Sequence, residues 1–135
     1  MESCVFCRIN NNEIPSWKVY ETELVMVLLA KEMEIFWHTL IIPKVHYKDI
    51  TDIPRNTLAD IMEVTNKIIL HYQNTLWSIW TNIIGATGEG AQQSIPHFHF
   101  HLLPRFKDDG LDTRPKLPDN EIDKDKLLQK IKILE

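Results

Sequence analysis

The fold of this 135-residue sequence is decided by Pro96-His97-Phe98-His99-Phe100-His101-Leu102-Leu103-Pro104-Arg105. Successive side chains of a β-strand point to opposite faces, so a strand over residues 97–103 places three imidazoles on one face. The opposite face then carries Phe98, Phe100 and Leu102, which favours burial against a core. Three of the six histidines of the chain fall within residues 97–101. The histidine face is therefore the candidate site for a ligand, a metal or water.

The segments on either side of this stretch predict an α+β domain, with an antiparallel sheet and one long helix packed on it. Apolar residues between Pro54 and Tyr72 recur at steps of three and four, which is typical of a helix with one buried face. Pro54 suits the first turn of this helix, and we expect Asp52 to cap it. Leu127 to Leu134 predict a short C-terminal helix, and residues 85–94 predict a glycine-containing loop. Runs rich in β-branched and aromatic residues predict further strands over 17–21, 24–30, 37–42 and 77–84.

Composition limits the class of protein. With 44% apolar and 25% charged residues, the chain falls in the ordinary globular range, and its length suits one domain. A net charge of −4 argues against binding a nucleic-acid polymer through overall charge. The longest uninterrupted apolar run, residues 24–30, is far shorter than the roughly 20 residues that span a bilayer. The N-terminus lacks the pattern of a signal peptide, so we expect a cytoplasmic protein with no membrane partner.

Charge is concentrated at the C-terminal end of the chain. Residues 107–135 hold 15 of the 34 charged side chains, together with Pro115 and Pro118. This pattern is typical of a solvated tail or a surface helix and not of a second domain. We therefore expect a folded domain over residues 1–106 and a charged tail with a short helix over residues 107–135.

The three histidines of the central stretch cannot all bind one metal ion in a regular strand. Residues i and i+4 lie about 13 Å apart along a strand, whereas zinc–nitrogen bonds are near 2.1 Å. The histidines are therefore expected to divide their roles. A separate Cys4-x-x-Cys7 pair at the N-terminus favours a metal half-site or a redox pair over a structural disulfide, and two buried free thiols are an alternative.

The central stretch resembles the signature of the histidine triad (HIT) family of nucleotide hydrolases and transferases, in which three histidines alternate with apolar residues. Other parts of the chain are similar to that family in order and spacing, from about Cys4 to Arg105. They are Cys4-Val5-Phe6-Cys7, Glu13-Ile14-Pro15, His38-Thr39-Leu40-Ile41-Ile42-Pro43-Lys44 followed by His46, and Gln93-Ser94. The resemblance covers some three quarters of the chain and does not include the tail.

The resemblance implies an enzyme that works through a covalent nucleotidyl-histidine intermediate. His99 would attack the α-phosphorus of a purine nucleoside phosphoramidate, adenylate or dinucleoside polyphosphate, and water would release the nucleoside monophosphate. An imidazole suits this role because its ordinary pKa of about 6.5 leaves much of it neutral at pH 7. Its other ring nitrogen then needs an acceptor such as a backbone carbonyl. His101 and His38 would hold phosphate oxygens, and Ser94, Gln93 and Gly88 would contribute loop donors.

The resemblance also implies a structural zinc ion and a partner. Zinc-bearing members of the family are similar to this chain in two cysteines, the histidine after Ile-Pro-Lys-x and the first histidine of the triad. The corresponding ligands here are Cys4, Cys7, His46 and His97. Family members are commonly homodimers that bind small nucleotides, so we expect the same of this chain.

Four positions depart from the family pattern, and two of them, Ala30 and Ala86, favour an alternative function. Ala30 stands where many members carry an aspartate that binds the ribose hydroxyls, and Ala86 stands where an asparagine is common near the phosphate. Gln92 and Trp37 replace residues that are usually small. The alternative is a zinc-stabilised nucleotide-binding or scaffold protein without turnover.

Overall fold

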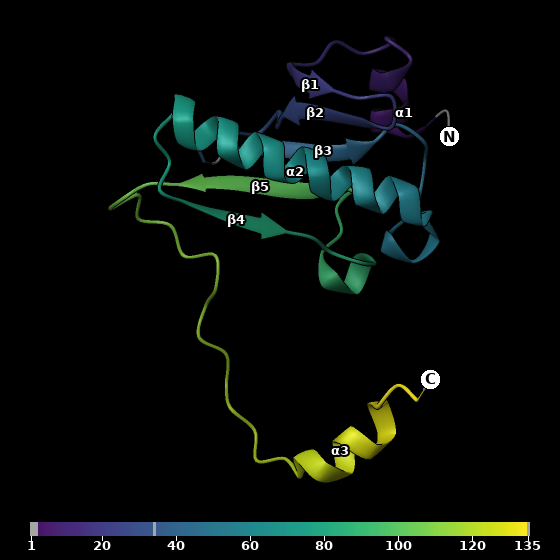
Figure 1. The fold of residues 1–135 in the computed structure, drawn as a ribbon, viewed down its shortest axis with the longest axis vertical. Coiled ribbons are helices and arrows are strands. Elements are labelled where there is room, and N and C mark those ends of the chain that lie inside the picture. The colour runs from purple at the N-terminus through teal and green to yellow at the C-terminus, as the bar shows by residue number, and fades with distance from the viewer. Residues whose placement is uncertain (1–2, 34, 135) are drawn as a thin grey trace.

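The computed structural model describes residues 3–33 and 35–134. A short helix, α1, lies at the N-terminal end, the long helix α2 lies in the middle of the chain, and five strands form the body (Figure 1). The elements are α1 (Val5–Asn10), β1 (Lys18–Glu21), β2 (Val25–Leu29), β3 (Thr39–Pro43), α2 (Arg55–Thr75), β4 (Trp80–Ile84), β5 (Phe100–Arg105) and α3 (Lys124–Ile131). Single turns of 3₁₀ helix occur at Ile50–Asp52 and Glu89–Ala91.

The strands form one antiparallel sheet in the order β1-β2-β3-β5-β4, and α2 lies across one face of it (Figure 1). The prediction of an α+β fold with an antiparallel sheet, one long helix and a short C-terminal helix is therefore confirmed. Strands β3 and β5 are remote in sequence but adjacent in the sheet. Their register pairs Thr39 with Leu102 and Leu40 with His101, which brings the start of β3 beside the triad.

Each face of the sheet has its own apolar cluster. On the α2 face, the buried side of the helix packs against Phe98, Leu102 and the strand residues Val25, Val27 and Ile41. On the other face, Phe6 of α1 packs with Met26, Leu28 and Ile42. The expected burial of Phe98, Phe100 and Leu102 is observed, because the first and last are at most 2% exposed and Phe100 packs against them.

Two strands begin three residues later than the sequence-based prediction. Strand β5 begins at Phe100 and not at His97, because the Phe98 amide donates to the Tyr47 carbonyl, outside the strand ladder. Strand β4 begins at Trp80 because Trp77 has a φ of +57°, which a strand cannot continue through.

Two features of the helices were not expected. Helix α1 has only six residues, too few to show a helical period in the sequence. Helix α2 begins at Arg55 after Pro54, and Asp52 does not cap it. Asp52 instead forms a capping box with Asp49 in the preceding 3₁₀ turn.

The beginning of the tail is fixed to the sheet. The guanidinium of Arg105 donates to both carboxylate oxygens of Asp109, to the side chain of Asn82 on β4 and to the Leu111 carbonyl. Beyond this clamp the chain leads away from the sheet to α3, and residues 114–134 are all exposed (Figure 1). The division at residues 106 and 107 stays a prediction. None of the described helices is long and apolar enough to cross a membrane.

Candidate functional site

A cavity of about 820 Å³ lies on the face of the sheet opposite α2. The alternation along β3 determines this placement, because Thr39 and Ile41 contact α2 residues or the α2 cluster while Leu40 lines the cavity. The cavity walls are mostly apolar, and its polar groups come from few positions. Four of the predicted site residues line it, namely His38, Ser94, His99 and His101.

His99 is held as a neutral base with one free ring nitrogen. Its Nδ1 lies 2.8 Å from the His97 carbonyl oxygen, which can only accept, so Nδ1 carries the proton. The backbone carbonyl expected from the sequence is therefore present. His99 is 6% exposed, and this burial lowers the pKa of the imidazole although the bond to the carbonyl opposes the shift. The lone pair of Nε2 is then available to attack an electrophile.

His38 and His101 contact each other directly across β3 and β5. The Nε2 of His38 lies 2.9 Å from the Nδ1 of His101, so one ring donates to the other. Burial lowers the pKa of His101 to about 4, and the nearby His99 and His38 add smaller contributions. The rings of His99 and His101 have centroids 4.8 Å apart. The structure thus places His101 between the other two histidines as a neutral ring near pH 7.

The loop before the triad is held together by Gln93. Its amide oxygen accepts from the Gly88 amide at 2.8 Å, and its amide nitrogen donates to the carbonyls of Lys48 and Ile95. Gly88 has a φ of +85°, where a side chain would be strained. Of these predicted loop donors, Ser94 faces the cavity, whereas the hydrogen bonds of Gln93 and Gly88 serve the loop itself.

The apolar walls of the cavity include residues that the sequence analysis did not single out. Val5, Phe6 and Ile9 of α1 line it, and Trp17 lies at its edge with 62% of its surface exposed. The sequence carries no signal for α1, because six residues are too few to show a helical period. Ala30, at 7% exposure, occupies the position where the family pattern has a carboxylate.

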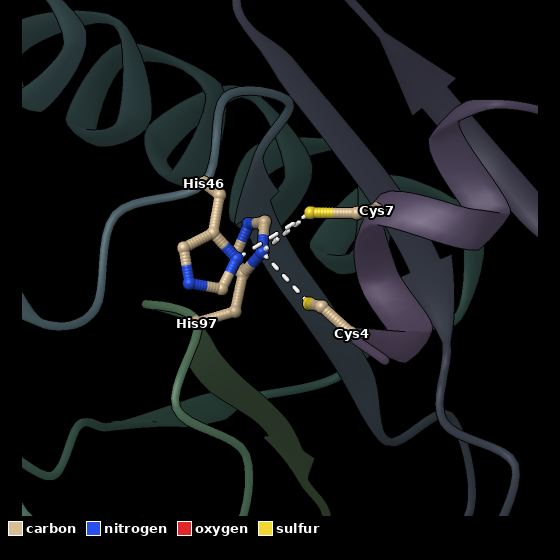
Figure 2. Close-up of side chains that lie close together, drawn as sticks. All are labelled: Cys4, Cys7, His46 and His97. Carbon is tan, nitrogen blue, oxygen red and sulfur yellow. Dashed lines mark hydrogen bonds between the residues drawn. The ribbon is translucent and has the colours of Figure 1, made fainter. Parts of the chain in front are cut away.

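The four predicted metal ligands converge at one place (Figure 2). The residues Cys4 and Cys7 come from the start of α1, His46 from the loop after β3, and His97 from the segment before β5. Their ligand atoms all lie within 4.8 Å of one another, with a Cys4 Sγ–His97 Nδ1 distance of 3.3 Å and a Cys7 Sγ–His46 Nδ1 distance of 3.4 Å. Both cysteines are free thiols, so they form no disulfide.

This donor set fits a tetrahedral zinc ion. Bonds of about 2.3 Å to sulfur and 2.1 Å to nitrogen require ligand atoms roughly 3.4 to 3.8 Å apart. Three Cys–His distances of 3.3, 3.4 and 3.6 Å are close to this range. The other nitrogen of His97 lies 2.8 Å from the Pro43 carbonyl and donates to it, which leaves Nδ1 facing the thiols as a ligand requires. Burial lowers the pKa of His97 to about 4 and raises that of the Cys7 thiol, and a bound cation would favour the Cys7 thiolate. Without an ion, the cluster holds two half-buried free thiols and not the fully buried pair of the alternative prediction.

Comparison with known proteins connects this geometry to a family. The model of the HIT domain matches residues 11–108. The crystal structure of a HIT family protein from Bacillus anthracis superimposes with a TM-score of 0.86 at 34% identity, covering 96% of this chain and 92% of that one. A zinc-bound histidine triad family protein from Mycobacterium smegmatis has a TM-score of 0.78 at 35% identity, over 87% and 85% of the two chains. Adenosine 5'-monophosphoramidase HNT1 of Candida albicans is 36% identical over 93% of this chain and 84% of its own.

Proposed function

This chain belongs to the HIT family of nucleotide hydrolases and transferases, and on that premise we propose that it cleaves small purine nucleotides at the α-phosphate. The observation that carries the proposal is the state of His99. Its Nδ1 is committed to a backbone carbonyl, and its ring lines the cavity beside His101 and Ser94. A neutral imidazole with one free lone pair beside fixed polar groups suits nucleophilic attack on phosphorus.

The proposed reaction has two steps. In the first step, the anionic phosphate of the bound nucleotide favours the protonated form of His101, which is neutral in the free protein. Nε2 of His99 forms a bond to the α-phosphorus while the bond from phosphorus to the leaving group breaks, and the leaving group takes the proton from the His101 imidazolium. Water then donates its hydroxyl to phosphorus and its proton to His101, which releases the nucleoside monophosphate and restores His99. His38 supports the exchange because it contacts the Nδ1 of His101, and His38, His101 and Ser94 bind the phosphate oxygens. Gln93 and Gly88 contribute by holding the loop that presents Ser94.

A phosphoramidate is the first substrate to test, because the Candida albicans relative is named as an adenosine 5'-monophosphoramidase. Rapid mixing of the protein with an amine-linked adenosine monophosphate should give a burst of free amine equal to the enzyme concentration, provided that the second step is the slower one. Single-turnover quenching should in any case trap the nucleotide on the protein. His99→Ala should abolish both signals, while His71→Ala, on the exposed side of α2, should retain them. Turnover by His99→Ala at the wild-type rate would contradict the proposal.

We further propose that the Cys4, Cys7, His46 and His97 cluster holds a structural zinc ion. The ion would tie α1 to the loop after β3 and to the segment before β5 when bound. The similarity of the chain to the zinc-bound histidine triad family protein from Mycobacterium smegmatis supports this proposal, together with the fit of the donor atoms. Thiols that serve as metal ligands suit a reducing compartment, so the proposed location is the cytoplasm.

We also propose a homodimer formed through β4. This strand lies at the edge of the sheet, where its outer backbone groups can pair with another strand. Trp80, Ile83 and Ile84 are exposed on it, at 60%, 44% and 37%. Sedimentation analysis should show a dimer for the wild type and a monomer for Ile83→Asp, and a monomeric wild type at micromolar concentration would refute this proposal.

A second candidate function is a zinc-stabilised nucleotide-binding or scaffold protein that has lost turnover. The observation that favours it is Ala30, which gives the cavity wall no carboxylate at the ribose position. Calorimetry and the burst experiment together distinguish the two candidates, because the scaffold protein would bind adenosine monophosphate without releasing any amine.

A further inference from the structure

The residue before His38 has an unusual backbone conformation. Trp37 has a φ of +70°, in the left-handed region that bulky side chains rarely adopt. Its side chain is 44% exposed, so close packing of the indole does not account for this conformation. Backbone strain of this kind persists only where the surroundings hold it in place.

A chain of two buried hydrogen bonds holds the Trp37 carbonyl. The hydroxyl of Thr39 donates to this carbonyl at 2.7 Å, and the hydroxyl of Tyr72 lies 2.8 Å from the Thr39 oxygen. Since the single hydroxyl proton of Thr39 is already committed, Tyr72 must donate the second bond. Thr39 is fully buried and Tyr72 is 7% exposed, so water does not compete for either bond.

The backbone turn at Trp37 also determines where the His38 side chain lies. The His38 carbonyl accepts from the Ala30 amide at 2.9 Å, and the His38 amide donates to the Ile35 carbonyl at 3.2 Å. Thr39 faces α2, so its neighbour His38 is directed to the opposite face and contacts His101 at 2.9 Å. A change of φ at Trp37 would rotate the backbone that enters His38 and move its imidazole.

We propose that Tyr72 is a positioning residue for the histidine site on the opposite face of the sheet. Its hydroxyl, acting through Thr39, holds the Trp37 carbonyl and so keeps the left-handed turn that places His38 against His101. Tyr72 lies on α2 and does not touch the cavity, so it acts on the substrate only through His38. The geometric part of this inference stands on the structure, and its effect on rate rests on the proposed function.

The inference predicts a specific kinetic effect. The two hydrogen bonds that join Tyr72 through Thr39 to the Trp37 carbonyl form a tether for the turn at Trp37. Without this tether, His38 contacts His101 for less of the time, and the proton transfer from His101 slows. Tyr72→Phe should lower kcat roughly three- to tenfold, the amount expected when a hydrogen bond of ordinary strength is lost. KM should change less than about twofold, because the apolar walls that bind the nucleoside are untouched.

Three further variants separate positioning from stability. Thr39→Val removes the middle hydroxyl and should reproduce the loss of kcat, whereas Thr39→Ser retains a hydroxyl and should restore most of it. Thr65→Val is the matched control, because Thr65 also carries a buried hydroxyl on α2. Among the described residues its hydroxyl bonds to its own helix alone, at the Ile61 carbonyl. This variant should lower thermal stability about as much as Tyr72→Phe while leaving kcat unchanged.

A measurement without substrate tests the tether independently. Long-range ¹H–¹⁵N spectra of the imidazoles report whether the Nε2 of His38 and the Nδ1 of His101 share a proton. The signal of a proton shared by these two nitrogens should be present in wild type and Thr65→Val, and it should be lost in Tyr72→Phe and Thr39→Val. If the wild type shows no turnover, the proposed function fails and these spectra still decide the tether. An unchanged spectrum in Tyr72→Phe, or an equal fall of kcat in Thr65→Val, would overturn the inference.

Discussion

Replacing Ala30 by aspartate should create a preference for ribose that the wild type lacks. Ala30 lies in the cavity wall at the end of β2, and its amide is committed to the His38 carbonyl. The position therefore offers no side-chain acceptor to the sugar hydroxyls, and the adjacent Lys31 can only donate. A carboxylate there would accept from the ribose hydroxyls, and removing one hydroxyl would leave a buried acceptor unpaired, at a cost of about 1 to 3 kcal/mol.

This energy corresponds to a selectivity of roughly 5- to 150-fold. The assay compares kcat/KM for phosphoramidates of adenosine and 2'-deoxyadenosine monophosphate. We expect a ratio below about five for the wild type and a ratio of tenfold or more for Ala30→Asp. Ala30→Asn is the control, because its amide has a similar size without the charge. A wild-type ratio of a hundredfold or more would refute the reasoning and show that another residue binds the sugar. Glu32 is the first candidate because it lines the cavity, and Glu34 lies outside the described residues.

Three further predictions concern the histidines and the cysteines. His99→Ala should abolish turnover yet still bind adenosine monophosphate, since His101 and Ser94 remain, and mass spectrometry that found the nucleotide on His101 of the wild type would contradict this role. Purified wild type should carry about one zinc ion per chain, and Cys4→Ser should lower the melting temperature more than it lowers kcat of the folded fraction; a metal-free wild type of equal stability would argue against the site. Because burial lowers the pKa of His101 to about 4, the folded protein binds fewer protons than the unfolded chain between about pH 4 and 6.5. The stability that neutral His101 contributes is therefore present above about pH 6.5 and is lost as the pH falls toward 4. The free energies of unfolding of wild type and His101→Asn, measured by denaturant titration, should converge over this range. A constant difference between them would show that His101 keeps its ordinary pKa.

Periodicity was enough to predict the layers of this fold. The helical spacing between Pro54 and Tyr72 and the alternation of histidine with apolar residues each reflect one buried face, and burial of a face is a local property of the sequence. Boundaries were less predictable because they depend on distant partners. Strand β5 begins late since the Phe98 amide bonds to Tyr47, and no local pattern contains that information.

In the candidate site, too, some features could be predicted from the local sequence and others depend on distant partners. The resemblance to the HIT family nominated the four metal-ligand candidates as one set, and their ligand atoms lie within 4.8 Å of one another in the structure. That they bind a metal ion stays a prediction. The contact between His38 and His101 depends on the register of β3 against β5, which pairs Leu40 with His101. Register is a property of the assembled sheet, so the sequence could nominate both residues without revealing that they touch.

His97 complicates the interpretation of any mutational scan of the triad. Its ring belongs to the cysteine cluster, while its carbonyl accepts the hydrogen bond from Nδ1 that fixes the tautomer of His99. An alanine at this position would remove the ring and disturb the backbone beside His99, so activity would fall although the side chain never meets the substrate. A scan scored by activity alone would rank His97 with His99 and count three chemical participants where the geometry supports two.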